Sequence, residues 1–298
     1  MTSWPYSLSR LTTIARQPGV RKALLVAATV VLGIGLLWAL NTSADVWSRV
    51  QWGPLLAVLF LIVPAVTLVN AYEFRVSAHL LGKEYSALTS LEVTVMGTAT
   101  NLLPVPGGTI VRVSALRTAG ASMSDSVQAT LLAGILWVGL TLSLAGTVLL
   151  VHATYIIGAC FALPGIMILA STLWRLTRLS INQRATSQLV VSKLVIIVLD
   201  TLRIHLCLAA IGVEIDFSNA MVLTASTVVG SSMSIVPAGL GVREWTQAAL
   251  APLVGVSVAD SFLSAVLVRI LGLVFIVPLA FALAVRSGPR SQSDARGS

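Results

Sequence analysis

Long apolar runs constrain this chain more than any other feature of its sequence. Hydrophobic residues make up 56% of the chain and charged residues only 10%, whereas a soluble domain carries about 25% charged residues. An α-helix needs roughly 20 apolar residues to cross a bilayer. Runs of about that length cover residues 22–40, 53–74, 126–150, 154–173, 190–211 and 259–285. We therefore expect an all-α integral membrane protein.

Two further apolar regions are interrupted by proline and glycine. Residues 86–103 run into Pro104, Pro106, Gly107 and Gly108, and residues 218–236 run into Pro237, Gly239 and Gly241. Proline removes a backbone N–H donor and clashes with the preceding helical turn, and glycine frees φ. Each region is therefore expected to form two short helical arms around a break, with the second arms ending near Arg117 and Leu250.

The placement of basic residues indicates the topology, because cytoplasmic loops of membrane proteins are enriched in lysine and arginine. If each broken region enters and leaves the membrane on one side, every strongly basic loop and both termini lie in the cytoplasm. Counting the first broken region as a span would instead place a basic loop outside, the one that contains Arg175, Arg178, Arg184 and Lys193. We expect about six spanning helices plus two re-entrant broken-helix hairpins.

The expected organisation is a single membrane domain in residues 22–285. Residues 1–21 are expected to be a cytoplasmic N-terminal segment, and residues 286–298 a disordered cytoplasmic tail. The first apolar run is too long for the core of a cleaved signal peptide, so we interpret it as a retained span. The prediction is a multi-pass protein of the inner or plasma membrane, with both termini in the cytoplasm.

The two broken regions match each other in sequence. Pro106, Gly108, Val111 and Arg112 recur in the same order and spacing as Pro237, Gly239, Val242 and Arg243. After a short insertion, Gly120, Ser122, Asp125 and Ser126 recur as Gly255, Ser257, Asp260 and Ser261. The repeat units cover about residues 53–150 and 190–285, and the three spans between the hairpins would invert the second copy. Inverted repeats with broken helices are a transporter architecture.

Ionisable residues inside apolar segments are energetically costly and usually functional. The candidates in this chain are Glu73, Glu92, Arg112, Asp200, Arg203, Arg243, Glu244 and Arg269. An arginine can bind a phosphate through two parallel hydrogen bonds. The free N–H groups of a half-helix that starts at a break add to such an anion site. Together these groups would suit a phospholipid headgroup.

Structural roles remain open for the arginines that follow the two breaks. Arg112 and Arg117 also fit ordinary basic residues on the cytoplasmic side. Arg243 would face the other side, so that rule does not explain it. Arg243 could instead pair with Glu244 or with Asp260, because charges inside a membrane usually pair.

Structural roles are also open for the charges in the later spans. Asp200 and Arg203 lie three residues apart on one expected helix and can neutralise each other. Arg269 lies near the middle of the last span, where its side chain would reach water with difficulty, so we expect it to face the protein interior. Glu92 is a candidate partner for it.

The sequence lacks the motifs of common soluble enzymes. It has no Gly-x-Ser-x-Gly elbow, Walker loop or dinucleotide-binding fingerprint. His79, His152 and His205 have no metal-ligand spacing, and Cys160 and Cys207 lie in apolar runs as packing residues. The net charge of +8 sits in short segments between apolar runs, where it would meet lipid headgroups rather than nucleic acid. We expect no metal, no cofactor and no nucleic acid.

The motifs at the two breaks resemble the flippase-like membrane domain of lysylphosphatidylglycerol synthases and the stand-alone proteins similar to it. The first motif is Asn101-Leu-Leu-Pro104-Val-Pro-Gly107-Gly-Thr-Ile-Val-Arg112. The second is Val236-Pro-Ala-Gly239-Leu-Gly241-Val-Arg243-Glu244, followed by Gly255-Val-Ser257 and Arg269. The resemblance covers nearly the whole chain. The expected substrate-binding residues are Arg112, Arg243, Glu244, Arg269, Glu92 and Asn101.

The first motif departs from the family pattern. Such proteins often have Gly-Glu where this chain has Gly108-Thr109, and often Glu-Arg where the next span has Ala133-Gly134. The first half is therefore expected to lack part of a charged network, which makes Pro237 to Glu244 the stronger candidate. In full-length synthases the aminoacyl-transfer activity belongs to a separate soluble domain, so we expect this chain not to be an enzyme.

The resemblance implies a flippase-like protein that moves a phospholipid or a lipid-linked headgroup between leaflets. One alternative is a secondary transporter of a small anion, which would share the architecture. Another is a non-transporting membrane partner of a glycosyltransferase or of another enzyme of envelope-lipid or glycan biosynthesis. Membrane lipid is the expected partner. If the chain is a non-transporting membrane protein, an enzyme of envelope-lipid or glycan biosynthesis is a further expected partner.

Overall fold

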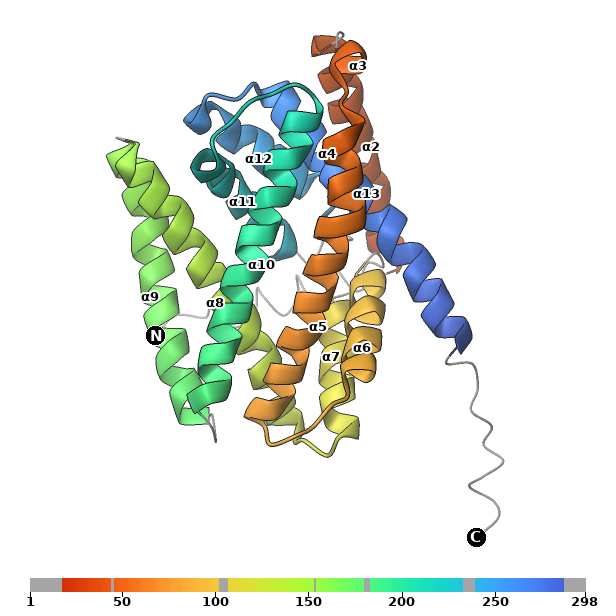
Figure 1. The fold of residues 1–298 in the computed structure, drawn as a ribbon, viewed down its shortest axis with the longest axis vertical. Coiled ribbons are helices and arrows are strands. Elements are labelled where there is room, and N and C mark those ends of the chain that lie inside the picture. Colours follow the sequence, from red (N-terminus) through yellow and green to blue (C-terminus); the bar gives the residue numbers. More distant parts are fainter. Residues whose placement is uncertain are drawn as a thin grey trace.

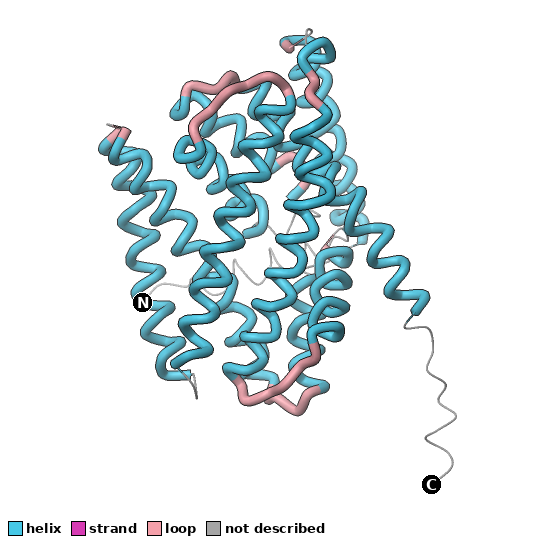
Figure 2. Tube along the Cα trace, viewed as in Figure 1, coloured by secondary structure: helices cyan, strands magenta, loops and turns pink. Residues whose placement is uncertain are grey.

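The fold was described from a computed structural model that covers residues 18–43, 46–101, 107–152, 154–179, 183–232 and 239–286. These residues form helices and short connections, with no strand among them (Figures 1 and 2). Within these described residues, four helices are long and apolar enough to cross a membrane. They are Trp52–Leu80, Met123–Val151, Tyr155–Arg178 and Val258–Arg286. The chain is therefore a multi-pass membrane protein, as its composition predicts.

Each of the six predicted spans lies, to within one residue, in a helix or a continuous helical rod, although the helices of the first and fifth are not among the four candidate spans found in the described residues. The rod comprises α4 (Trp52–Ala57), a π-helical stretch (Val58–Ile62) and α5 (Val63–Leu80). The other helices are α2 (Pro18–Thr42), α8 (Met123–Val151), α9 (Tyr155–Leu179), α10 (Gln183–Ala210) and α13 (Val258–Arg286). A short helix, α3 (Val46–Arg49), precedes the rod.

The prediction for the span at residues 190–211 was wrong at its start. Helix α10 already begins at Gln183, and Lys193, which we expected in a cytoplasmic loop, is buried with 6% of its surface exposed. Charges inside this helix also include Asp200 and Arg203. The charged residues lower the apolar content of α10, so composition alone underestimates how much of this helix is buried. In the structure, ionic contacts take the place of apolar ones in the interior.

The two broken regions each contain two short helices. The first region forms α6 (Ala87–Thr100) and α7 (Gly107–Thr118), and the second forms α11 (Phe217–Ser232) and α12 (Val242–Leu250). Helix α6 has 14 residues, which gives a length of about 21 Å, whereas the hydrocarbon core is about 30 Å thick. Within each region the two helices pack on each other. The predicted break residues Pro104, Pro106 and Pro237 lie outside the described residues.

The two helix pairs lie toward opposite ends of the bundle. Figure 1 shows α6 and α7 at its lower end and α12 at its upper end. The chain packs α5 on α6, α6 on α7 and α7 on α8, and the same order of neighbours returns in α10, α11, α12 and α13. The basic residues Arg117, Arg178 and Arg184 belong to helix ends that meet at the lower end of Figure 1.

The turns that lead into the two helix pairs have the same hydrogen bonds. Gly82, with φ of 67°, follows α5, and Gly212, with φ of 77°, follows α10. The N–H of Gly82 donates to the third residue before it, at 3.0 Å, and the N–H of Gly212 does the same at 3.0 Å. Glycine ends both helices because the left-handed conformation has no Cβ clash there.

The turns that lead out of the helix pairs also correspond. The hydroxyl of Ser122 accepts the N–H of Asp125 at 3.1 Å, and that of Ser257 accepts the N–H of Asp260 at 3.0 Å. Each hydroxyl donates in turn to the carboxylate of the same aspartate at 2.7 Å. These are N-cap interactions, which satisfy free donors of the first helical turn. The matched sequence positions therefore have matched local structure.

Glycines bring the two helices of each pair into close contact. A Cβ added to Gly97 would lie 3.4 Å from the Cα of Gly108, and one added to Gly239 would lie 2.4 Å from the carbonyl oxygen of Gly230. The second contact leaves no space for any side chain at Gly239, whose φ of 61° also favours glycine.

The two largest apolar clusters among the described residues both include residues of α10. One joins Ile204 and Leu208 of α10 to Phe262 of α13. The other joins Leu189 of α10 to Leu136 of α8. Helix α10 therefore connects the two halves of the bundle.

Helices α8 and α9 lie side by side at one edge of the bundle (Figure 1). A Cβ on Gly146 would lie 2.3 Å from the backbone nitrogen of Ala162, and one on Gly165 would lie 2.5 Å from that of Ser143. Small residues at such positions let the backbones of membrane helices approach closely. This contact depends on the absence of a side chain.

We predict that Gly146→Leu separates α8 from α9 and lowers stability by at least about 1 kcal/mol, because overpacking typically costs about 1–3 kcal/mol. Thermal unfolding of the purified protein in detergent would measure the loss. Gly134→Leu is the matched control, since Gly134 lies on the same helix and a Cβ there would meet nothing within 4 Å. Equal melting temperatures for the two variants would contradict the prediction.

Candidate functional site

The first charged cluster surrounds the buried carboxylate of Glu73 on α5. Its Oε2 atom accepts a hydrogen bond from Nη1 of Arg112 on α7 at 2.8 Å, and its Oε1 atom lies 3.3 Å from Nζ of Lys193 on α10. The hydroxyl of Ser77 donates to Oε1 at 3.1 Å. Both carboxylate oxygens therefore have partners, and the cluster ties α7 to α5 and α10.

This cluster changes the interpretation of the first repeat unit. We expected its charged network to be incomplete, because Gly108-Thr109 and Ala133-Gly134 replace charged residues of the family pattern. The structure instead supplies the carboxylate for Arg112 from α5 and a second cation from α10. Arg112 is thus an ion-paired residue, with its guanidinium carbon 5.9 Å from the centre of the Phe74 ring.

The second charged cluster begins with an ion pair between α12 and α13. Nε of Arg269 lies 2.5 Å from Oε1 of the fully buried Glu244. Nη2 of Arg269 also donates to the backbone oxygen of Gly239 at 3.2 Å. Arg269 thereby faces the protein interior, as predicted, and connects the last helix to the residues that precede α12.

Arg243 lies in the same cluster without being part of that pair. Its charge interacts with those of Asp200, Arg203, Glu244 and Arg269, which are its electrostatic neighbours. Its Nε and Nη2 atoms are buried and have no hydrogen-bond partner among the described residues. A buried donor without a partner carries the full cost of desolvation. The arrangement therefore leaves a cationic group with unused donors inside the protein.

The remaining members of the second cluster are also incompletely satisfied. Nη2 of Arg203 donates to Oδ1 of Asp200 at 2.6 Å, so the pair predicted from their spacing is present. Nε of Arg203 and Oε2 of Glu244 are buried and lack hydrogen-bond partners within the described part of the chain. The cluster combines three arginines with two carboxylates, and so carries an excess positive charge.

Two pairings that the sequence left open are not formed among the described residues. Arg269 pairs with Glu244 rather than with Glu92, which is half-buried on α6. Arg243 pairs neither with Glu244 nor with Asp260, because Asp260 caps α13 and accepts the hydroxyl of Ser43 at 2.9 Å. Adjacency in sequence did not identify a partner for Arg243, because successive side chains on a helix point in different directions.

Asn101 has a local role at the first break. Its Oδ1 atom accepts a hydrogen bond from the N–H of Gly108 at 2.7 Å, near the start of α7. A Cβ on Gly108 would lie 2.8 Å from the side-chain nitrogen of Asn101, so a larger residue there would displace the amide that accepts this hydrogen bond. The contact links the end of α6 to the start of α7.

A polar network beside the second cluster was missed by the sequence analysis. The buried side chain of Gln247 on α12 donates to the backbone oxygen of Ser261 at 3.0 Å and to the hydroxyl of Ser264 at 2.8 Å. Ser261 donates back to the backbone oxygen of Gln247 at 3.1 Å. The sequence signal for this network is the position of Gln247, which lies one helical turn after Glu244 and therefore on the same face of α12. The network holds α12 rigidly on α13.

We predict that Glu73→Gln destabilises the protein by about 3–5 kcal/mol, because removing one partner of a buried ion pair leaves the other uncompensated. Thermal unfolding in detergent would measure the effect. Glu84→Gln is the matched control, since Glu84 is exposed and forms no ion pair within the described residues. If the two variants melted together, the Glu73 cluster would not hold α7 in place.

Comparison with known protein families identifies a match for most of the chain. A family model described as the lysylphosphatidylglycerol synthase TM region matches residues 24–280, which is most of the chain. The match concerns the membrane region of that family, and no catalytic synthase domain is detected in the sequence. No curated protein matches the chain.

Proposed function

Because the chain belongs to the lysylphosphatidylglycerol synthase TM region family, we propose that it is a flippase-like membrane protein. Its substrate is a phospholipid or a lipid-linked molecule with an anionic headgroup, which it moves between the leaflets. The acyl chains stay in the bilayer while the headgroup passes through the protein.

The observation that carries this proposal is that Nε and Nη2 of Arg243 are buried without a hydrogen-bond partner among the described residues. An anion would accept hydrogen bonds from these two buried nitrogens and would offset the excess positive charge of the cluster. A phosphate accepts two parallel hydrogen bonds from a guanidinium, and such charge-assisted bonds are about twice as strong as neutral ones. Arg269 is already held by Glu244 and so serves to position the cluster. Arg243 is the residue that binds the headgroup.

The arrangement of the helices supports the proposal. The pairs α6–α7 and α11–α12 have matching turns at both ends and lie toward opposite ends of the bundle (Figure 1). We interpret them as re-entrant hairpins of an inverted repeat, with α11–α12 entering from outside and the basic end in the cytoplasm. Rocking of the two halves about the central charges would then expose Arg243 to each leaflet in turn.

Single cysteines test the hairpin topology, in a chain with Cys160 and Cys207 replaced by alanine. Glu84→Cys and Thr118→Cys flank the first hairpin, and Glu214→Cys and Val258→Cys flank the second, all at exposed positions. A membrane-impermeant maleimide added to intact cells should label only the second pair, and should label the first pair only after lysis. Labelling of one residue within a pair from each side would show that the region spans the membrane and would refute the hairpin.

Transport is tested with the purified protein in liposomes that contain fluorescent phospholipids of several headgroups. A membrane-impermeant quencher reports lipid that has moved to the outer leaflet. We predict that Arg243→Gln slows movement of the substrate lipid about tenfold or more, because a hydrogen bond to a charged group contributes about 1.5–3 kcal/mol.

The matched control is Arg178→Gln, which removes an exposed arginine that lies 4.5 Å from the Trp174 ring. This variant should move lipid at the parent rate. Undiminished transport by Arg243→Gln would exclude Arg243 as the headgroup site. Uptake of soluble phosphate without lipid movement would instead identify a secondary anion transporter. Folded protein that moves neither would favour a non-transporting partner of a lipid or glycan enzyme.

A further inference from the structure

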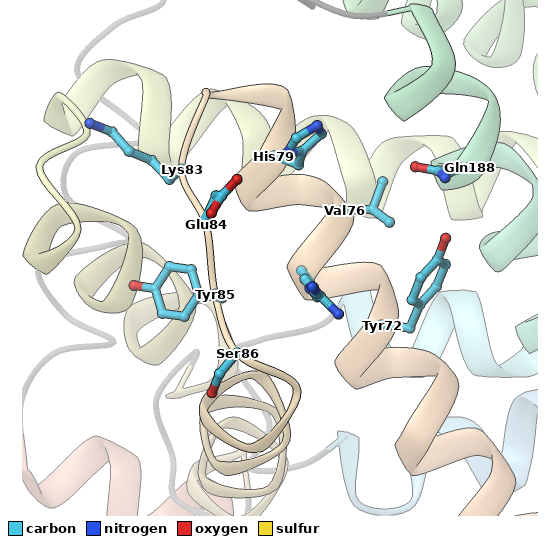
Figure 3. Close-up of a pocket in the computed structure, with 9 residues that line it drawn as sticks. Tyr72, Val76, His79, Lys83, Glu84, Tyr85, Ser86 and Gln188 are labelled. Carbon is cyan, nitrogen blue, oxygen red and sulfur yellow. The ribbon is translucent and has the colours of Figure 1, made fainter.

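A second cationic site lies at the lower end of the bundle, where α5 ends. A pocket of about 490 Å³ opens between α5, the connection from α5 to α6, and the start of α10. Its polar lining includes Tyr72, Arg75, His79, Lys83, Tyr85 and Gln188. Figure 3 shows Tyr72, Val76 and Gln188 on one side and Lys83, Glu84, Tyr85 and Ser86 on the other. Pockets of about 300–1,000 Å³ are large enough for small ligands.

The charge of the pocket comes from one face of α5. Arg75 and His79 are one helical turn apart, so both side chains project from the same face. Lys83 also lines the pocket, but its amine points away from α5 (Figure 3), with Nζ 3.5 Å from where a Cβ on Gly120 would stand. In the part of the chain that the structure describes, neither Arg75 nor Lys83 forms an ion pair. The only carboxylate that lines the pocket is Glu84.

An apolar surface continues from the pocket along the same two helices. Leu68 lies one turn before Tyr72 on α5 and is 59% exposed. On α10, Val191 and Val195 follow Gln188 at intervals that keep them on one face, and they are 58% and 40% exposed. Since α5 and α10 run in opposite directions and pack together (Figure 1), both surfaces extend from the pocket toward the middle of the bundle. A cationic pocket thus joins an apolar track.

We propose that this pocket binds the phosphate headgroup of an anionic phospholipid, whose acyl chains lie against the exposed apolar residues of α5 and α10. Arg75 supplies the planar pair of N–H donors that matches a phosphate, and His79, one turn further along α5, adds a donor. Tyr72 presents an aromatic ring between the polar pocket and the apolar track, as tyrosines do at membrane interfaces. A soluble phosphate would use the pocket but not the track.

This site is separate from the Arg243 cluster, since the pocket is lined by neither Arg243 nor any of its charged neighbours. The inference therefore stands whether or not the protein moves lipids. Binding is best measured in the Arg243→Gln chain, so that the second cluster does not contribute. Native mass spectrometry in detergent would titrate phosphatidylglycerol and phosphatidylcholine with identical acyl chains.

We expect tighter binding of phosphatidylglycerol than of phosphatidylcholine, and a loss of about tenfold when Arg75→Gln is added, the size expected for one hydrogen bond to a charged group. Arg178→Gln, which removes an exposed arginine outside the pocket, should leave binding unchanged. If Arg75→Gln melts at a lower temperature than its parent, Arg75→Lys provides the second variant, because it keeps a cation and should retain most of the binding.

Equal binding of the two lipids, or no loss in Arg75→Gln, would overturn the proposal. Soluble probes decide between a lipid and a free anion. Glycerol 1-phosphate and inorganic phosphate should compete with phosphatidylglycerol only at concentrations far above that of the lipid. Tight, Arg75-dependent binding of either soluble anion, with no preference for phosphatidylglycerol, would assign the pocket to a soluble phosphate and refute the lipid.

Discussion

The buried carboxylate of Glu73 holds the first half of the structure together. Helix α7 is short and sits on a break that contains prolines, so neither its length nor its own hydrogen bonds anchor it in the bundle. Arg112 on α7 and Lys193 on α10 both contact Glu73 on α5, so three charged side chains from three helices form one ionic cluster. In a medium without water, an unpaired charge is costly, and the pairing therefore selects one packing of α5, α7 and α10.

The second half uses charge differently. Glu73 has donors on both oxygens, whereas Glu244 has one buried oxygen without a partner and Arg243 has two such nitrogens, within the described residues. The two halves have matching turns and caps but differ in how completely their charged groups are hydrogen-bonded. In the first half both Glu73 oxygens are paired by residues of this chain, and in the second half these three buried atoms of Glu244 and Arg243 are not paired within the described residues. We interpret the first cluster as an anchor and the second as the proposed site.

Much of the fold could be predicted because its signals are local. Apolar length located the spans, and proline with glycine located the four short helices to within a few residues. Glycines and serine–aspartate caps also act within one turn, which is why the repeat was visible in the sequence. The family resemblance was confirmed over residues 24–280. The start of α10 was missed, because Lys193 looks like a loop residue unless its distant partner is known.

The ionic pairings could not be predicted for the same reason. Glu73 and Lys193 come into contact only because α5 packs on α10. Arg269 pairs with Glu244, although Glu92 carries the same charge and was an equally good candidate from the sequence. The sequence indicated that each of these buried charges needs a partner of opposite charge. Only the three-dimensional packing shows which residue is that partner. The pocket beside Arg75 was invisible for a similar reason, since it needs Gln188 from a different helix.

Helix α10 carries Lys193 of the first cluster and Asp200 of the second. These residues are separated by about two helical turns, or roughly 10 Å along the axis. Lys193 pairs with Glu73 on α5, and Asp200 lies beside Arg243 on α12. A shift of α10 along its axis would therefore move one member of each cluster at the same time. The packing of this single helix sets the geometry of both ionic clusters.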